Sequence, residues 1–248
     1  METILYDQFY RIEEEHWWFV ARREIILDQL RRYAPFPTAN DILDVGCGTG
    51  IMLQCLQGFG RVQGFDFSPE ALAYCRRRVG GSVPLTLGTL GEKPPFPPRT
   101  FDVITLLDVI EHIEDDQAAV RGARDLLRPG GVVICTVPAH PFLWSGHDVL
   151  NQHKRRYTAR ELRRTIAGAG LRIEKFSYFN TLLAPAVFAA RLATPRRRRL
   201  EPRSDFKVYP RWLNILLTRI FLLEKPLLRL ANAPFGVSLL CVARRVDA

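Results

Sequence analysis

The sequence has no apolar stretch long enough to cross a membrane. A spanning helix needs about 20 consecutive apolar residues, and no run in these 248 residues reaches that length. The first eighteen residues, METILYDQFYRIEEEHWW, also carry acids where a secretory signal carries a basic start and an apolar stretch. We therefore expect neither a spanning helix nor a secretory signal.

Cysteine is scarce and scattered. The count is odd, and no two cysteines form a Cys-x-x-Cys pair. This usage is typical of reduced thiols, so we expect a cytoplasmic protein. The five residues are Cys47, Cys55, Cys75, Cys135 and Cys241.

Acidic residues are the minority among the charges. The chain has 26 Asp and Glu against 35 Lys and Arg, a formal net charge of +9. Such an excess favours an acidic partner, which could be nucleic acid, an anionic membrane surface or an anionic substrate. The length and the 47% hydrophobic content suit one α/β domain with an insertion.

Short apolar runs alternate with helical patterns along most of the chain. This alternation predicts an α/β fold with a doubly wound, mostly parallel sheet. Ser68 followed by Pro69, and TARE at 158–161, are helix starts. The predicted strands are residues 41–45, 61–67, 83–87, 101–107, 132–137, 171–179 and 236–245.

Two segments fall outside this alternation. Residues 1–33 have a helical pattern that ends at PFPTAN, and residues 180–235 separate the last two strands. A compact domain closes such a connection in a few residues. We therefore predict a single domain over 1–248, with an N-terminal helical lid (1–40), a core (41–179 and 236–248) and an inserted helical cap (180–235).

The glycine-rich stretch ILDVGCGTG (42–50) follows the first predicted strand. It is no P-loop, because no Lys-Ser or Lys-Thr follows the glycines. It also misses the dinucleotide fingerprint, since Ile51 stands where the third glycine belongs. Asp66 ends the second strand, where a carboxylate accepts from ribose hydroxyls. GTLGEKPPF follows the third strand, where an adenine could sit.

The ordered set of motifs resembles the class I S-adenosylmethionine-dependent methyltransferases, of the type 11 and type 23 kind. The motifs are Asp-x-Gly-x-Gly-x-Gly, Asp66, LLDVIEHI (106–113) and LRPGG (127–131). The resemblance to ubiquinone-biosynthesis O-methyltransferases is looser. Together these likenesses imply a Rossmann-like sheet of seven strands with an antiparallel last strand. They also imply S-adenosylmethionine as cofactor and S-adenosylhomocysteine as product.

The resemblance also implies contacts with the cofactor. Gly46 and Gly48 would approach its amino-acid end, and Asp66 would hold the ribose. Leu90 would lie by the adenine, and an arginine before the first strand, Arg22 or less favourably Arg23, would pair with the carboxylate. The full set is Arg22, Asp44, Gly46, Gly48, Gly50, Asp66, Phe67, Leu90, Leu107 and Asp108.

Histidines near strand ends are the candidate proton acceptors. His112 follows the fourth strand, where it could equally pack its short helix. His147 and His153 lie in the loop after the fifth strand, residues 139–158. That loop is either a substrate-binding surface or a solvated basic loop. Its candidate substrate contacts are Trp144, Asp148, Arg155, Arg156 and Tyr157.

A metal ion is not expected. Some ubiquinone-pathway and RNA-end methyltransferases carry Glu-x-x-Glu-His and bind a divalent ion with a later histidine. In this chain the stretch is Asp108-x-x-Glu111-His112, with Asp in place of the first Glu. That departure weakens the case for a metal site.

The predicted function is methyl transfer to a small-molecule, glycan or lipid-linked acceptor. The net charge raises an RNA methyltransferase as an alternative, but the arginines cluster in the insertion without the aromatic platform of an RNA reader. Nucleic acid is therefore the less favoured partner. A non-catalytic S-adenosylmethionine-binding protein is the third alternative.

The insertion is apolar and basic at once. Residues 179–193 and 211–223 are apolar, with a kink expected near Pro226, and PRRRRLEPRSDFK (195–207) lies between them. One hypothesis is peripheral attachment to an anionic membrane surface. The other is burial within the fold or in a homodimer. A narrow polar stripe follows helical spacing at Arg211, Asn214, Thr218, Lys225 and Arg229.

Overall fold

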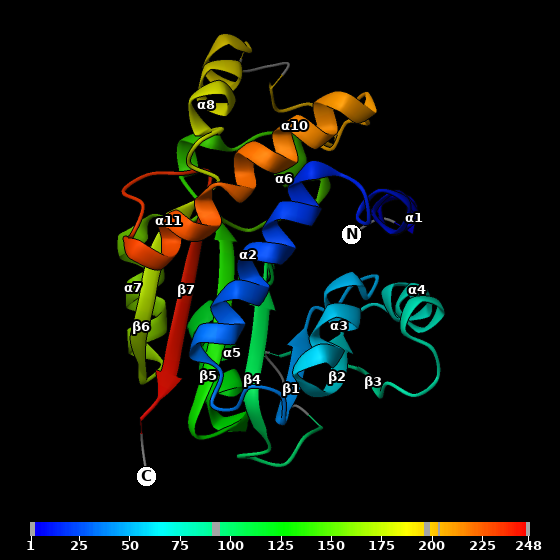
Figure 1. Cartoon of the computed structure of the whole chain (residues 1–248), viewed down its shortest axis with the longest axis vertical. Helices are drawn as coiled ribbons and strands as arrows, with labels where there is room; N and C mark the ends of the chain where they lie inside the picture. Colours follow the sequence, from blue (N-terminus) through cyan, green and yellow to red (C-terminus); the bar gives the residue numbers. More distant parts are fainter. Residues whose placement is uncertain (1–2, 91–94, 196–198, 203, 247–248) are drawn as a thin grey trace.

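A seven-stranded sheet forms the centre of the molecule (Figure 1). The computed structural model describes residues 3–90, 95–195, 199–202 and 204–246. The strand order is β3-β2-β1-β4-β5-β7-β6, and β7 alone runs antiparallel to its neighbours. The predicted fold class is thus confirmed. The strands are β1 Asn40–Val45, β2 Gly60–Asp66, β3 Leu85–Leu87, β4 Phe101–Leu107, β5 Leu127–Pro138, β6 Leu171–Phe179 and β7 Ser238–Arg245.

Helices cover both faces of the sheet. In the N-terminal part they are α1 Thr3–Ile12, α2 Trp17–Tyr33, α3 Ile51–Leu56 and α4 Pro69–Val79. Further along the chain they are α5 Asp116–Leu126, α6 Gly146–Leu150, α7 Ala159–Gly168, α8 Ala184–Ala193, α10 Arg211–Leu222 and α11 Glu224–Leu230. Short 3₁₀ turns are η1 Gln57–Phe59, η2 Ile110–His112 and η3 Pro141–Leu143.

The alternation of side chains along each strand builds two cores. Ile42 packs with α2, α3, α10 and α11, whereas its neighbour Leu43 packs with α5 and α7 on the opposite face. The predicted helix starts are confirmed. Ser68 accepts from the Ala71 N–H at the start of α4, and Thr158 forms the capping box of α7.

Several boundaries differ from the predicted ones. The N-terminal helical stretch is two helices, because the chain breaks after α1 and His16 caps α2 through its ring nitrogen. β5 begins five residues before the predicted position 132, since LRPGG already pairs with β4 and joins the strand.

The insertion lies over the carboxyl edge of the sheet (Figure 1). α10 rests on α2, where the Trp17 N–H donates to Asn214 Oδ1 at 2.8 Å. The kink is confirmed: α10 ends at Leu222, four residues before Pro226, whose ring cannot accommodate that carbonyl in a helix. Among the described residues no helix is both long and apolar enough to span a bilayer.

Candidate functional site

The glycine loop after β1 has a backbone that other residues could not adopt without strain. Gly46, Gly48 and Gly50 all have positive φ angles, of 66°, 53° and 88°. A Cβ at Gly46 would come within 2.6 Å of Val109 Cγ2. The loop therefore exposes bare backbone at the carboxyl end of β1. Asp66, Phe67 and Leu90 lie near the same end.

Asp66 closes one side of a recess of about 150 Å³. Its carboxylate accepts from the Gly48 and Ser68 N–H groups, each at 2.9 Å. Burial raises the pKa of Asp66. Each oxygen keeps a lone pair for another donor. Phe67 and Leu90 line the same recess, together with Gly46 and Asp108.

Asp44 lies at the end of β1 and lines a second, larger cavity of about 580 Å³. It is buried, and Thr105 Oγ1 donates to its Oδ1 at 2.5 Å. Burial raises the pKa of Asp44 to about 7. Leu107 and Gly46 line this cavity as well, so residues predicted for the methionine end of the cofactor share one wall.

Arg22 reaches the same wall from α2. Its Nη2 lies 2.8 Å from Asp108 Oδ2 and 2.9 Å from Thr136 Oγ1. Asp108 itself has a φ of 58°, in the left-handed region. The guanidinium also lies over the Trp18 ring, 4.9 Å from its centroid. Within the described residues, Arg22 Nε has no hydrogen-bond acceptor.

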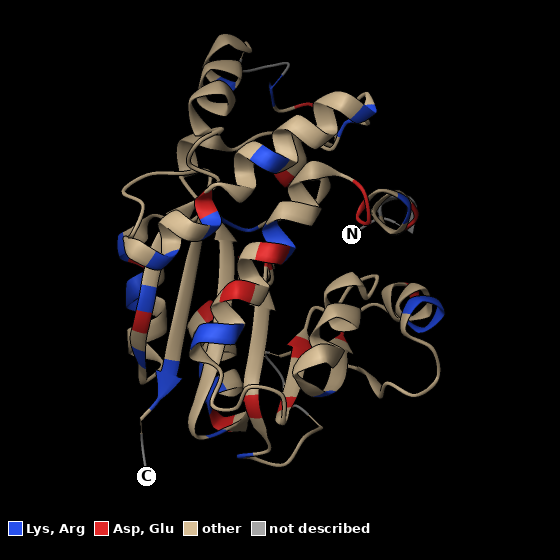
Figure 2. Cartoon of the chain, viewed as in Figure 1, with Lys and Arg blue, Asp and Glu red and all other residues tan. Residues whose placement is uncertain are grey.

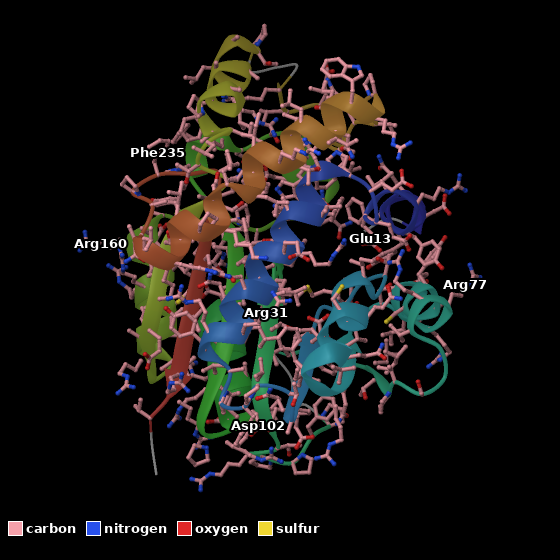
Figure 3. All side chains as sticks on the ribbon, viewed as in Figure 1. Glu13, Arg31, Arg77, Asp102, Arg160 and Phe235 are labelled. Atoms are coloured by element: carbon pink, nitrogen blue, oxygen red, sulfur yellow. The ribbon has the colours of Figure 1, made fainter. Side chains whose placement is uncertain are left out.

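Glu13 ties the N-terminal helices to the glycine loop (Figure 3). Its buried carboxylate contacts Thr49 Oγ1 and Arg78 Nη1. Arg78 also donates to the Thr49 and Tyr10 carbonyl oxygens, at 3.0 and 2.9 Å. Burial raises the pKa of Glu13, against the opposing effect of Arg78. These contacts hold α1 beside the loop, on the side predicted to be a lid.

The far end of the larger cavity is aromatic. Phe206, from the insertion, has its ring centroid 4.7 Å from that of Phe19 and 5.3 Å from that of Trp18. The rings of Phe9, His16 and His147 lie between 5.1 and 5.5 Å from it. The cavity thus extends from the glycine loop to side chains of the insertion.

The three candidate histidines gather on one wall of this cavity. The His112 ring centroid is 4.7 Å from that of His153, and the His147 centroid is 6.2 Å from it. Burial lowers the pKa of His112 to about 3 and that of His147 to about 4. Both imidazoles are therefore neutral near pH 7.

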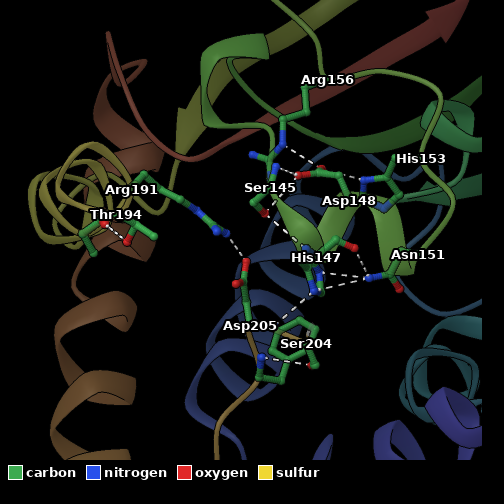
Figure 4. A network of polar contacts seen from close by, with 12 residues as sticks. Ser145, His147, Asp148, Asn151, His153, Arg156, Arg191, Thr194, Ser204 and Asp205 are labelled. Atoms are coloured by element: carbon green, nitrogen blue, oxygen red, sulfur yellow. Dashed lines mark hydrogen bonds and ion pairs between the residues drawn. The ribbon is translucent and has the colours of Figure 1, made fainter. Parts of the chain in front are cut away.

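His153 has a carboxylate partner (Figure 4). Its Nδ1 lies 2.9 Å from Asp148 Oδ1, and Arg156 Nε donates to the same oxygen at 2.7 Å. Burial opposes ionisation of Asp148, but the hydrogen bond from His153 and the charge of Arg156 lower its pKa. An ionised Asp148 fixes the His153 proton on Nδ1 and leaves Nε2 as an acceptor.

Glu111 belongs to the Asp108-x-x-Glu111-His112 stretch, for which the sequence does not predict a metal ion. It is fully buried, and neither carboxylate oxygen has a partner among the described residues. Burial, reinforced by Asp108, raises its pKa well above the usual range. One ligand atom each from Glu111, His112 and His153 lie within 4.8 Å of one another. An unpartnered carboxylate beside two imidazoles fits a divalent cation.

The predicted substrate contacts divide into two groups. Arg156 lines the larger cavity, and Asp148 acts behind it by holding Arg156 and His153. Three residues do not line the cavity. Tyr157 lies in the core with its hydroxyl 2.6 Å from Asp116 Oδ2, Arg155 donates to the Glu114 carbonyl, and Trp144 is half-buried away from the cavity.

A comparison of the sequence with models of known protein families finds a match. A model described as "Methyltransferase domain" matches residues 18–175. The chain belongs to the methyltransferase domain family. Its cofactor is S-adenosylmethionine, and the resemblance to class I methyltransferases is confirmed.

Curated relatives carry two kinds of name. A "probable S-adenosylmethionine-dependent methyltransferase" of Mycolicibacterium smegmatis is 32% identical over 166 residues, covering 66% of this chain. A ubiquinone biosynthesis O-methyltransferase of Thiobacillus denitrificans is 36% identical over 96 residues, covering 37% of this chain. The matches span 62% and 41% of the lengths of these relatives.

Solved structures share the fold at low sequence identity. The complex of a Haloferax volcanii methyltransferase with its Trm112 activator has a TM-score of 0.64 at 19% identity, covering 99% of this chain and 96% of that one. A phosphoethanolamine N-methyltransferase of Haemonchus contortus, solved with S-adenosylmethionine, has a TM-score of 0.60 at 23% identity, covering 90% and 53%. These likenesses concern the fold alone.

Proposed function

We propose that this methyltransferase transfers the methyl group of S-adenosylmethionine to a hydroxyl oxygen of a small, apolar, lipid-linked acceptor. The observation that carries the proposal is the single cavity joining Asp44 and Gly46 to the aromatic ring of Phe206. Such a cavity suits a reacting group beside the cofactor and an apolar body beyond it. The names of the O-methyltransferase relatives support oxygen as the acceptor atom.

The cofactor would lie across the carboxyl edge of β1, β2 and β4. Asp66 would accept from the ribose hydroxyls, with the adenine between Phe67 and Leu90. Asp44 would face the methionine amino group. Arg22 lines the same cavity and would donate to the methionine carboxylate, while Asp108 holds its Nη2.

The transfer step needs alignment and a destination for one proton. When bound, the cofactor would supply the methyl group: a lone pair of the acceptor oxygen would form the new carbon–oxygen bond, and the electron pair of the broken carbon–sulfur bond would stay on sulfur. Alignment of the two reactants can supply about 7–11 kcal/mol. The hydroxyl proton would pass to His153 Nε2, and Asp148 would stabilise the imidazolium. A base of this kind contributes about 10²–10⁴-fold.

A second candidate role for the same wall is cation binding. The observation in its favour is the unpartnered carboxylate of Glu111 beside His112 and His153. These three residues would hold a divalent ion, which when bound lowers the pKa of a coordinated hydroxyl. His153 would then be a ligand, and the proton would leave from a more acidic oxygen.

The test is methyl incorporation from S-adenosylmethionine labelled in its methyl group. The acceptors compared are phenols carrying alkyl chains, free sugars and total RNA. We expect label in the alkylated phenols, and its loss in Arg156→Gln. Arg155→Gln is the matched control, since Arg155 does not line the cavity.

Other outcomes of this test point to other functions. Label in RNA would establish the protein as an RNA methyltransferase. Label in free sugars would contradict the proposal of an apolar acceptor. Tight cofactor binding without incorporation into any of the three classes would favour a non-catalytic binding protein.

A further inference from the structure

The consecutive helices α10 and α11 turn three residues of the predicted polar stripe toward α2. Lys225 Nζ lies 3.0 Å from Glu24 Oε2 of α2, and Arg229 Nε donates to Asp28 of the same helix at 3.0 Å. Asn214 accepts from the start of α2. Three members of the polar stripe predicted from the sequence therefore face the protein. Phe221 and Leu228 are buried on this inner side as well, and the exposed apolar residues of the two helices lie on the outer side.

The opposite side of these helices is apolar and exposed. Its members recur at helical spacing, so they share one face. At its two ends Trp212 is 68% exposed and Leu230 is 86% exposed. Soluble monomers rarely display contiguous apolar surface of this kind without a partner. We name this surface the outer stripe, and its residues are Trp212, Ile215, Leu216, Leu223, Leu227 and Leu230.

Three exposed cations lie along or beside the outer stripe. Arg219 falls within its spacing, and Lys207 and Arg211 are exposed at its N-terminal end, where Figure 2 shows basic positions on α10. None of the three has an ion pair within the described residues. The segment from residue 204 to residue 230 contains two acids, Asp205 and Glu224.

Both of those acids are already paired or buried. Asp205 is bound to Arg191 of α8 (Figure 4). Glu224 is buried and accepts from the Thr181 and Leu182 N–H groups, at 2.6 and 2.8 Å. Neither acid of residues 204–230 therefore neutralises the three cations, and the exposed acid next to α10 is Glu15, whose carbonyl oxygen accepts from Asn214. Arg196 to Arg198 and Arg203 of the basic run lie outside the described residues.

We propose that the outer stripe docks the protein onto an anionic phospholipid bilayer. Leucines beside cations, with a tryptophan at the border, suit the interface of such a membrane. A second copy fits less well, because a twofold interface would bring the same unpaired cations together. The proposal does not depend on the acceptor proposed above, since docking needs no turnover.

The docked face adjoins the acceptor cavity. Val187, Ala190 and Arg191 of α8 line that cavity, as do Phe206 and Tyr209 of the segment leading into α10. α8 and α10 lie at the same end of the molecule, beyond the carboxyl edge of the sheet. A bilayer under the outer stripe would thus lie beside the cavity wall that the insertion supplies.

Flotation with vesicles tests this surface. The full chain is mixed with phosphatidylcholine vesicles, with or without phosphatidylglycerol. We expect binding only to the anionic vesicles, weakened by salt and by about fivefold for each of Arg211→Gln and Arg219→Gln. The double variant Leu223→Ser/Leu227→Ser should weaken binding at least about tenfold. Phe36, in the segment before β1, is 49% exposed. Phe36→Ser is therefore the matched control, and this variant should bind the vesicles normally.

Two further measurements keep this test decisive. Calorimetric binding of S-adenosylhomocysteine by every variant shows that the fold and the cofactor site persist, so a failure of docking stays separate from a failure of the proposed reaction. Sedimentation reports the oligomeric state. Absence of anionic-vesicle binding by the native chain would overturn the proposal. So would unchanged binding by the double leucine variant, or a stable dimer that this variant dissociates.

Discussion

Removing the Asp66 carboxylate should cost most of the affinity for the cofactor. The side chain ends β2, lines the recess proposed for the adenine and keeps lone pairs beyond those used by Gly48 and Ser68. Two ribose hydroxyls donating to an ionised carboxylate contribute about 1.5–3 kcal/mol each. The sum of about 3–6 kcal/mol corresponds to a dissociation constant about 10²–10⁴-fold weaker in Asp66→Ala.

The same substitution should also loosen the glycine loop. Without Asp66, the Gly48 and Ser68 N–H groups lose their acceptor, and a buried donor left unpaired costs about 1–3 kcal/mol. Thermal unfolding measures that loss separately. Asp66→Asn keeps one side-chain oxygen, so it should be more stable than Asp66→Ala while still binding the cofactor more weakly than the native chain.

Calorimetry with S-adenosylhomocysteine is the assay, and Asp41→Ala is its control. Asp41 lies at the amino end of β1, with its carboxylate 2.7 Å from Arg61 Nε and 2.9 Å from Arg128 Nη2. Removing it should lower stability without changing the dissociation constant. Equal affinity of Asp66→Ala and Asp41→Ala for S-adenosylhomocysteine would refute the ribose contact.

Three more outcomes are expected. His153→Gln should lower kcat by about 10²–10⁴-fold with little change in cofactor affinity. Native turnover of this variant would show that His153 is not the base. Treatment with a chelator should leave turnover intact if His153 is that base; a loss restored by Mn²⁺ would instead assign Glu111, His112 and His153 to a cation. Because burial raises the pKa of Asp44 to about 7, the folded chain holds its proton more tightly than the unfolded chain. The stabilisation from this group is complete below about pH 4 and lost as the pH rises through 7, so Asp44→Asn should flatten that part of the stability–pH curve.

Local signals in the sequence were sufficient to predict the sheet and to place the proposed cofactor residues at its strand ends. Ser68 and the Thr158–Glu161 box start their helices through contacts a few residues apart, and strand periodicity needs no distant partner. Gly46 and Asp66 lie at strand ends, which parallel topology brings to one edge. These features are written within short windows, so the sequence alone could reveal them.

The acceptor side depends on partners far away in the chain. Tyr157 resembles a loop residue, yet its hydroxyl finds Asp116, 41 positions earlier, and becomes part of the core. Phe206 lies in a segment without periodicity and meets Phe19 and Trp18 of α2. His153 and Glu111 come together only because the loop after β5 folds back over η2. No local pattern encodes such encounters.

The orientation of α10 and α11 illustrates the same limit and links the two halves of the molecule. Their sequence shows that the polar residues share a face. It does not show that Lys225 and Arg229 pair with Glu24 and Asp28 of α2, 201 positions earlier in each case. α2 therefore has two functional sides. Arg22 points from it toward Asp108 and the wall proposed to hold the cofactor, while its outer acids, Glu24 and Asp28, hold the insertion. Contacts that fasten the insertion thus also fix the helix that presents Arg22, so the outer stripe and the cofactor wall share one rigid support.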